Sequence, residues 1–105
     1  MALGRRGEIW IVDLGMAAKP RPALILSVEA LDNERALVTY VPRTTSLRGT
    51  RFEVSHQARG FDLGGFDVQG LGSVPNAKLM RQVGTLDALT LGKVEIAVKA
   101  WLGLA

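Results

Sequence analysis

The sequence predicts a mainly β domain that ends in one α-helix, and three observations lead to this prediction. Between residues 8 and 84, short runs of β-branched, aromatic and other apolar residues alternate with turns. From residue 87 onwards, apolar residues recur at three- and four-residue spacing, which is the period of a helix. Glycines cluster between residues 60 and 72, where they suit the bends and bulges of a small, strongly curved sheet.

Each expected strand is marked by a local pattern. Residues 8–14 are rich in β-branched and aromatic side chains and end at a glycine. Residues 22–28 form a nearly continuous apolar run, which is typical of a strand buried on both faces. Residues 36–41 form a third strand that stops at Pro42, because proline cannot donate to a ladder. Residues 50–56 alternate between apolar and polar, and further short strands are expected at residues 66–69, 72–74 and 79–83.

The C-terminal segment carries one apolar stripe, formed by Leu91, Val94, Val98, Trp101 and Leu102. Asp87 is the predicted N-cap of this helix, and Gly103 is the predicted stop. We expect one domain over residues 1–105, with a barrel at about 6–84 and a helix at about 87–102 packed across it.

Composition excludes several classes of site. The 105 residues include no cysteine, which excludes disulfides, thiolate nucleophiles and cysteine-based zinc sites. The one histidine, His56, excludes a multi-histidine metal site, and phosphate-loop, nucleophile-elbow and zinc-protease motifs are absent from the sequence. We therefore expect no cofactor and no metal. No apolar run has the length of a membrane span and the N-terminus lacks a signal-peptide core, which predicts a cytoplasmic protein without a membrane partner.

Basic residues point to a polyanionic partner. The net charge is +3, and the candidates for contact with a nucleic acid lie in one stretch that contains a single acidic residue, Glu53: Arg43, Arg48, Arg51 and Arg59. His56 lies in the same stretch and is a candidate acid or base. A solvated loop with arginines that serve solubility is the competing interpretation, as is a surface role for His56.

Two short segments combine stiffness, positive charge and hydroxyl groups. Residues 19–22 read Lys-Pro-Arg-Pro, so prolines hold Lys19 and Arg21 in extended conformations before the second strand. Thr44, Thr45 and Ser46 follow the third strand. If the two strands pair antiparallel, these segments meet and form one phosphate site, with a guanidinium fork and neutral hydroxyl donors. Alternatively, Arg21 is an ordinary surface arginine and the hydroxyl residues close a loop.

The order of segments resembles the MazF/PemK family of toxin ribonucleases from bacterial toxin–antitoxin modules. The resemblance covers nearly the whole chain and is carried by residues 6–15 (RGEIWIVDLG), 21–27 (RPALILS), 41–47 (VPRTTSL), 83–87 (VGTLD) and 102–104 (LGL). It implies an SH3-like β-barrel of the MazF/CcdB type with a packed C-terminal helix. It also implies a homodimer that cleaves single-stranded mRNA at short sequences without a metal and is inhibited by a cognate antitoxin.

By position in the family's motifs, Arg21 and Thr44 match the catalytic residues, and Thr45 and Ser46 lie at or beside the family's serine. The segment 15–19 is shorter than in relatives and lacks their glutamate, so no general base is carried over. Residues 69–73 also lack the acidic residue that relatives place there.

The main alternative to an endoribonuclease is a toxin of the same fold that binds a protein such as DNA gyrase. A third possible function is that of an inert RNA- or peptide-binding barrel.

Overall fold

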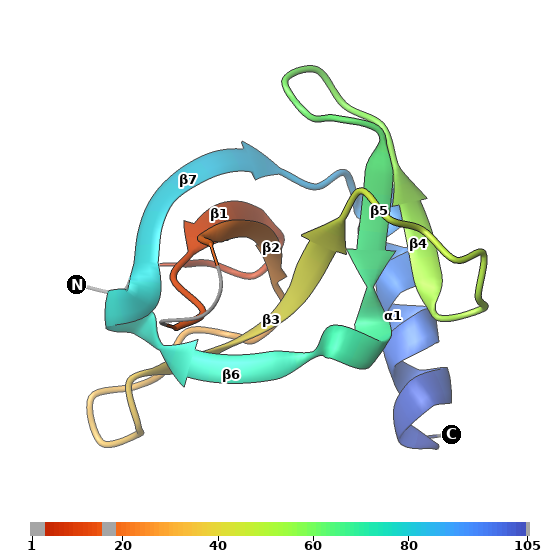
Figure 1. Ribbon diagram of the computed structural model, residues 1–105. Helices are drawn as coiled ribbons and strands as arrows, with labels where there is room; N and C mark the ends of the chain where they lie inside the picture. Colours follow the sequence, from red (N-terminus) through yellow and green to blue (C-terminus); the bar gives the residue numbers. More distant parts are fainter. Residues whose placement is uncertain (1–3, 16–18, 105) are drawn as a thin grey trace.

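The computed structural model describes residues 4–15 and 19–104, in which seven strands form one antiparallel sheet and a single α-helix follows (Figure 1). The strands are β1 (Glu8–Val12), β2 (Arg21–Ile25), β3 (Leu37–Thr44), β4 (Glu53–His56), β5 (Gly64–Asp67), β6 (Gly72–Pro75) and β7 (Leu79–Thr85). Two short 3-10 helices, η1 (Val68–Gly70) and η2 (Asn76–Lys78), flank β6, and α1 spans Ala88–Leu102. The predicted mainly β fold with a C-terminal helix is confirmed.

The sheet is open. Its strand order is β4-β5-β3-β2-β1-β7, and β6 pairs with the first half of β3 beside this path. β7 curves around β1 and β2, as Figure 1 shows, but within the described residues no ladder joins β7 to β4 or β6. The predicted closed SH3-like barrel is therefore not confirmed.

β3 continues through Pro42 to Thr44, so the prediction that this strand stops at Pro42 is wrong. The carbonyl of Thr39 accepts from the amide of Leu26 (2.9 Å) and the amide of Thr39 donates to the Ser27 hydroxyl (2.9 Å), so the backbone groups of Thr39 face β2. Three residues further along, Pro42 lies opposite Ala23 in a pair where the N–H groups point away from the partner strand. The missing N–H of Pro42 therefore costs the β2–β3 ladder no hydrogen bond.

Other strand boundaries also shift. The strand predicted at residues 50–56 begins only at Glu53, because the Glu53 carboxylate accepts hydrogen bonds from the backbone amides of Arg48 and Thr50 and folds the preceding segment into a loop. The strand predicted at residues 66–69 ends at Asp67. There the Asp67 side chain accepts from the amide of Gln69 and caps η1.

The core has two parts, one on each face of β2. Leu24 belongs to the larger part, with Ile9, Val41, Phe66 and Val94 among its members, whereas Ala23 and Ile25 belong to the smaller part with Val12, Val38 and Leu79. All three β2 residues are fully buried. Burial on both faces is therefore confirmed for this strand, but the strand predicted at residues 22–28 ends at Ile25, and Val28 is exposed.

The C-terminal helix α1 packs against β4 and η1 (Figure 1). Asp87 caps it as predicted, since its carboxylate accepts from the amide (3.0 Å) and hydroxyl (2.9 Å) of Thr90. Gly103 ends it in the left-handed region, at a φ of 69° that favours glycine. Val94 is buried, whereas Trp101 at the end of the predicted stripe stays 43% exposed while its ring contacts Phe52 edge-on.

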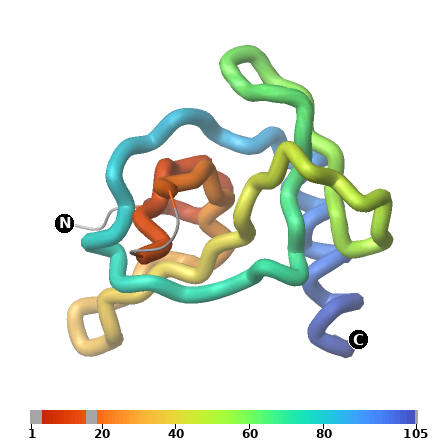
Figure 2. Tube along the Cα trace, in the orientation of Figure 1, coloured from red at the N-terminus to blue at the C-terminus, as the bar shows by residue number. Residues whose placement is uncertain are grey.

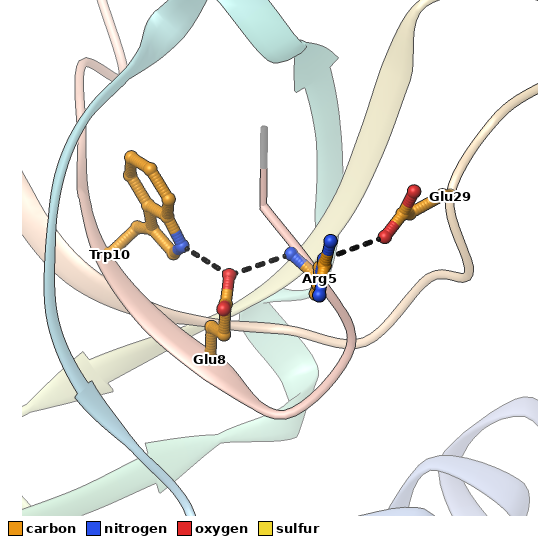
Figure 3. Close-up of polar contacts among 4 residues, drawn as sticks. All are labelled: Arg5, Glu8, Trp10 and Glu29. Atoms are coloured by element: carbon orange, nitrogen blue, oxygen red, sulfur yellow. Dashed lines mark hydrogen bonds and ion pairs between the residues drawn. The ribbon is translucent and has the colours of Figure 1, made fainter. Parts of the chain in front are cut away.

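A polar cluster fixes the start of β1 (Figure 3). One oxygen of Glu8 accepts from the backbone amide of Arg5 (2.8 Å) and from the indole N–H of Trp10 (3.0 Å), while the Arg5 side chain pairs with Glu29 (3.0 Å). The two donated hydrogen bonds, first that of Arg5, lower the pKa of the Glu8 carboxyl. The cluster holds the N-terminal segment against the loop that follows β2.

Candidate active site

The start of β2 and the end of β3 meet, as the sequence analysis expects for an antiparallel pair. The ladder sets Leu24 opposite Val41 and Ala23 opposite Pro42 and ends there, two residues before Arg21 on β2 and two residues before Thr44 on β3. At this point β3 leaves β2 and pairs with β5, with Arg43 opposite Phe66. The segment 42–46 therefore passes between β2 on one side and β5 on the other.

Glycines let β5 approach this segment closely. A Cβ atom on Gly64 would lie 2.2 Å from the carbonyl oxygen of Thr44, and one on Gly65 would lie 2.4 Å from the carbonyl oxygen of Val54. Any side chain at either position would push β5 away from its neighbours. The two glycines thus set the spacing of the strands that support the candidate site.

Two pockets flank the end of β3. The first, with a volume of about 230 Å³, is lined by Arg21, Pro22, Arg43, Thr45, Gly60, Phe61 and Asp62, and we call it the Arg21 pocket. Both Arg21 and Thr45 are exposed at its mouth. A cationic fork beside a hydroxyl is the donor set that binds a phosphate group.

The second pocket, of about 390 Å³, is lined by Thr44, Ser46, Arg48, Thr50, Glu53, Asp67 and Gln69, and we call it the Thr44 pocket. The Thr44 hydroxyl oxygen accepts from the amide of Ser46 (3.0 Å), which leaves the hydroxyl proton available to a ligand. Hydrogen bonds from the amides of Arg48 and Thr50 lower the pKa of Glu53. This pocket therefore offers acceptors as well as donors.

The structure thus groups the predicted residues differently from the expectation of a single site. It brings Arg21 together with Thr45 in one pocket and places Thr44 with Ser46 in the neighbouring one. Successive side chains of an extended segment point to opposite sides, which separates Thr45 from Thr44 and Ser46. Lys19 is exposed, and residues 16–18 of the shortened segment 15–19 lie outside the described residues.

Arg43 and His56 are buried, at 7% and 6% exposure, which contradicts the surface position predicted for Arg43 and the alternative interpretation of His56 as a surface residue. Arg43 follows the inward-facing Val41 on β3, and its Nε donates to Nδ1 of His56 (2.9 Å). Its Nη2 donates to the backbone carbonyls of His56 (2.9 Å) and Asp62 (2.5 Å). The prediction that Arg43 belongs to an exposed RNA-contacting surface is corrected, because its guanidinium is engaged inside the protein.

The sequence fits one known family over nearly its whole length. Residues 5–102 match the family model described as PemK-like, MazF-like toxin of type II toxin–antitoxin system. The chain belongs to this toxin family. The resemblance read from the sequence motifs is thereby confirmed.

Solved structures of MazF-type toxins share the fold. A mycobacterial endoribonuclease in complex with its cognate antitoxin is 25% identical, with a TM-score of 0.85 and 98% of each chain covered. The Mycobacterium tuberculosis toxin MazF-mt6 is 30% identical, with a TM-score of 0.80, over 93% of this chain and 98% of that one. A further mycobacterial endoribonuclease is 25% identical with a TM-score of 0.79, over 95% of this chain and 91% of that one.

The remaining predicted cations of this MazF-type chain are exposed. In the part of the chain that the structure describes, the salt bridges are Arg5–Glu29, Arg6–Glu95 and Lys78–Asp13, so the side chains of Arg48, Arg51 and Arg59 form none. Arg48 lines the Thr44 pocket, and the Arg51 guanidinium lies 4.5 Å from the centre of the Phe52 ring. These three arginines keep the surface position that contact with an RNA backbone requires.

Sequence reasoning missed Phe61 and Asp62, which line the Arg21 pocket. Both lie in the β4–β5 hairpin loop, residues 57–63, which extends beyond the strand ends in Figure 1 and projects from the rest of the trace in Figure 2. Nothing local in the sequence connects this loop to β2.

Among residues 4–15 and 19–104, no group of three or more carboxylate or imidazole side chains is placed to hold a metal ion. No helix in these residues has the length and apolarity of a membrane span.

Proposed function

We propose that this MazF-type chain is an endoribonuclease toxin that cleaves single-stranded RNA at short specific sequences without a metal ion. The observation that carries the proposal is the Arg21 pocket, which exposed Arg21 and Thr45 line together, next to the Thr44 pocket. The endoribonuclease relatives of the same fold support it. A chain that cleaves mRNA would act in the cytoplasm, and a homodimer would supply two copies of the site.

The reaction needs donors for a phosphate that gains charge. The 2′-oxygen of one nucleotide attacks the adjacent phosphorus, the bond to the 5′-oxygen of the next nucleotide breaks, and a cyclic phosphate and a 5′-hydroxyl end result. One proton leaves the 2′-hydroxyl and one reaches the departing 5′-oxygen. Arg21 stabilises the phosphoryl oxygens, and because arginine stays protonated it does not serve as the base. The hydroxyl of Thr44 or Thr45 adds a neutral donor.

The polar lining of the Thr44 pocket suits a nucleotide next to the cut. The side-chain oxygens of Glu53 and Asp67 would offer acceptors, and the side-chain amide of Gln69 would offer a donor, to base edges or ribose hydroxyls. Arg48 at the same pocket, with Arg51 and Arg59 on the surface, would contact the phosphates that follow. Ser46 lines the same pocket, and exposed Lys19 precedes Arg21 by two residues in the chain, where it would add a cation beside the Arg21 pocket.

An antitoxin partner follows from the same surface. One relative is an endoribonuclease that was solved with its cognate antitoxin. We infer that an antitoxin segment with acidic side chains occupies the surface of Arg48 and Arg51 and so competes with RNA. Arg48→Glu and Arg51→Glu should then weaken RNA and antitoxin binding together. Loss of RNA binding with unchanged antitoxin affinity would separate the two surfaces.

The rate at which the Arg21→Ala variant cleaves RNA tests the proposal. Loss of one oxyanion donor lowers the rate about 10²- to 10³-fold. The matched control is Arg81→Ala, since Arg81 is also an exposed strand arginine but lies on β7. Gel assays in chelator compare both variants with the wild-type protein on single-stranded RNA. Cleavage by Arg21→Ala at the wild-type rate would refute the site, and intact RNA with inhibition of DNA gyrase would refute the endoribonuclease itself.

A further inference from the structure

The buried guanidinium of Arg43 ties together three elements behind the Arg21 pocket. Its hydrogen bonds join the end of β3 to the end of β4 through His56, and to the β4–β5 hairpin loop through the carbonyl of Asp62. The ring of Phe61 lies 5.0 Å from the guanidinium and 5.2 Å from the imidazole of His56. Arg43 therefore contacts the loop that supplies Gly60, Phe61 and Asp62 to the pocket, and Phe61 also packs against the larger part of the core.

These contacts require a neutral histidine. The Nε of Arg43 is always a donor, so Nδ1 of His56 has to accept, and the imidazole then carries its proton on Nε2. Protonation of His56 would turn two donors toward each other and add a second buried cation. We call the three hydrogen bonds of Arg43 the clamp. Loss of the clamp would release the hairpin loop that forms one wall of the Arg21 pocket.

The surroundings of His56 favour this neutral form. Burial and the positive charge of Arg43 on β3 both lower the pKa of His56, and Asp87 at the start of α1 opposes them weakly. The remaining contacts are the rings of Phe61 and Phe66, which carry no charge. Burial lowers the pKa of Arg43, and the negative charge of Asp62 opposes this effect.

We propose that Arg43, oriented by neutral His56, is the positioning residue of the Arg21 pocket, and that protonation of His56 releases the pocket wall. The clamp is complete above about pH 6.5, the ordinary pKa of histidine, and is lost as the pH falls through the lower pKa of His56. The effect on RNA cleavage rests on the proposed function, whereas the clamp itself does not.

Nuclear magnetic resonance of the ¹⁵N-labelled full chain observes the clamp without activity. At pH 7.5 the Nε–H signal of Arg43, assigned by its loss in Arg43→Lys, should exchange slowly with water, whereas that of exposed Arg21 exchanges fast. Acidification should abolish the protection of the Arg43 signal in step with the titration of His56. Fast exchange at pH 7.5, or protection that persists after His56 has titrated, would overturn the proposal.

Cleavage kinetics test the consequence. Below the pKa of His56, wild-type kcat/KM should fall about tenfold per pH unit, and this decline is the acid limb of the pH profile. His56→Asn keeps an oxygen acceptor for Arg43 but does not titrate, so it should retain activity within about threefold at pH 7.5 and lose this acid limb. Arg43→Lys keeps the charge without the three contacts, and should lower kcat by about ten- to a hundredfold while KM changes less. Thermal unfolding confirms that each variant is folded.

Two results would contradict the positioning role: an unchanged acid limb in folded His56→Asn, or a wild-type kcat in folded Arg43→Lys. If the wild-type chain cleaves no RNA at any pH, the proposed function fails. The exchange of the Arg43 signal still decides whether the clamp exists.

Discussion

Replacement of Phe66 by alanine tests whether β5 anchors the site to the core. The Phe66 ring is fully buried, lies opposite Arg43 in one ladder and Val54 in the other, and sits 5.0 Å from the ring of His56. Alanine would remove the ring and leave a cavity beneath the Arg21 pocket. The expected result is a large loss of stability, because packed strands on both sides limit collapse of the cavity.

The size of the loss follows from burial and chain length. Truncation of a buried phenylalanine to alanine costs about 3–5 kcal/mol. For 105 residues, an unfolding entropy of about 2.1 cal/mol/K per residue converts this loss into a fall in melting temperature of about 14–23 °C. Since domains of this size are stable by only about 5–15 kcal/mol, Phe66→Ala should be close to the limit of folding.

Calorimetry and urea titration followed by tryptophan fluorescence measure the change. Met80→Ala is the control, because Met80 is 58% exposed on β7 and its truncation should alter the free energy of unfolding by less than about 0.5 kcal/mol. A loss below about 1 kcal/mol for Phe66→Ala would refute the reasoning that β5 is packed into the core.

Three further predictions address the site and its surroundings. Thr44→Ala and Thr45→Ala should each slow cleavage less than Arg21→Ala, because a neutral hydroxyl is a weaker donor than a guanidinium; a wild-type rate in both would remove the hydroxyls from the mechanism. RNA affinity should fall with salt, and Arg48→Gln and Arg51→Gln should each reduce the log–log slope by about 0.7, whereas a flat salt titration would exclude contact with the RNA backbone. Because its folded pKa is lowered, Glu8 stabilises the fold above its unfolded pKa and loses this contribution as the pH falls; Glu8→Gln should therefore flatten acid unfolding between pH 5 and 3, and an identical curve would contradict the bonding in Figure 3.

Much of the fold was predictable because its signals are local. The apolar run at residues 22–28 predicted a strand buried on both faces, and Asp87 and Gly103 predicted the limits of α1. The extension of β3 through Pro42 was not predictable, since it depends on which pairs of the β2–β3 ladder are hydrogen-bonded. Register of this kind is set by partners elsewhere in the chain.

The site was predictable only in part for the same reason. The stiff segment around Arg21 and the hydroxyls at residues 44–46 are visible in the sequence, and antiparallel pairing brings them together. Burial of Arg43 depends on His56 and on a carbonyl at Asp62, which lie 13 and 19 residues further along the chain. Arg43 was therefore assigned to the surface together with the neighbouring arginines. Its position two residues after the buried Val41 on β3 places it on the inward face of the strand.

Cleavage of an RNA with one 2′-hydroxyl removed tests the central claim most directly. An RNA that the wild-type protein cuts is resynthesised with a 2′-deoxy nucleotide on the 5′ side of the cut, and both RNAs are incubated with the protein in chelator. If the 2′-oxygen attacks the phosphorus beside Arg21, the all-ribose RNA is cut to a 5′-hydroxyl product and the 2′-deoxy RNA binds but stays intact. Cleavage of the 2′-deoxy RNA at the same bond would contradict this mechanism.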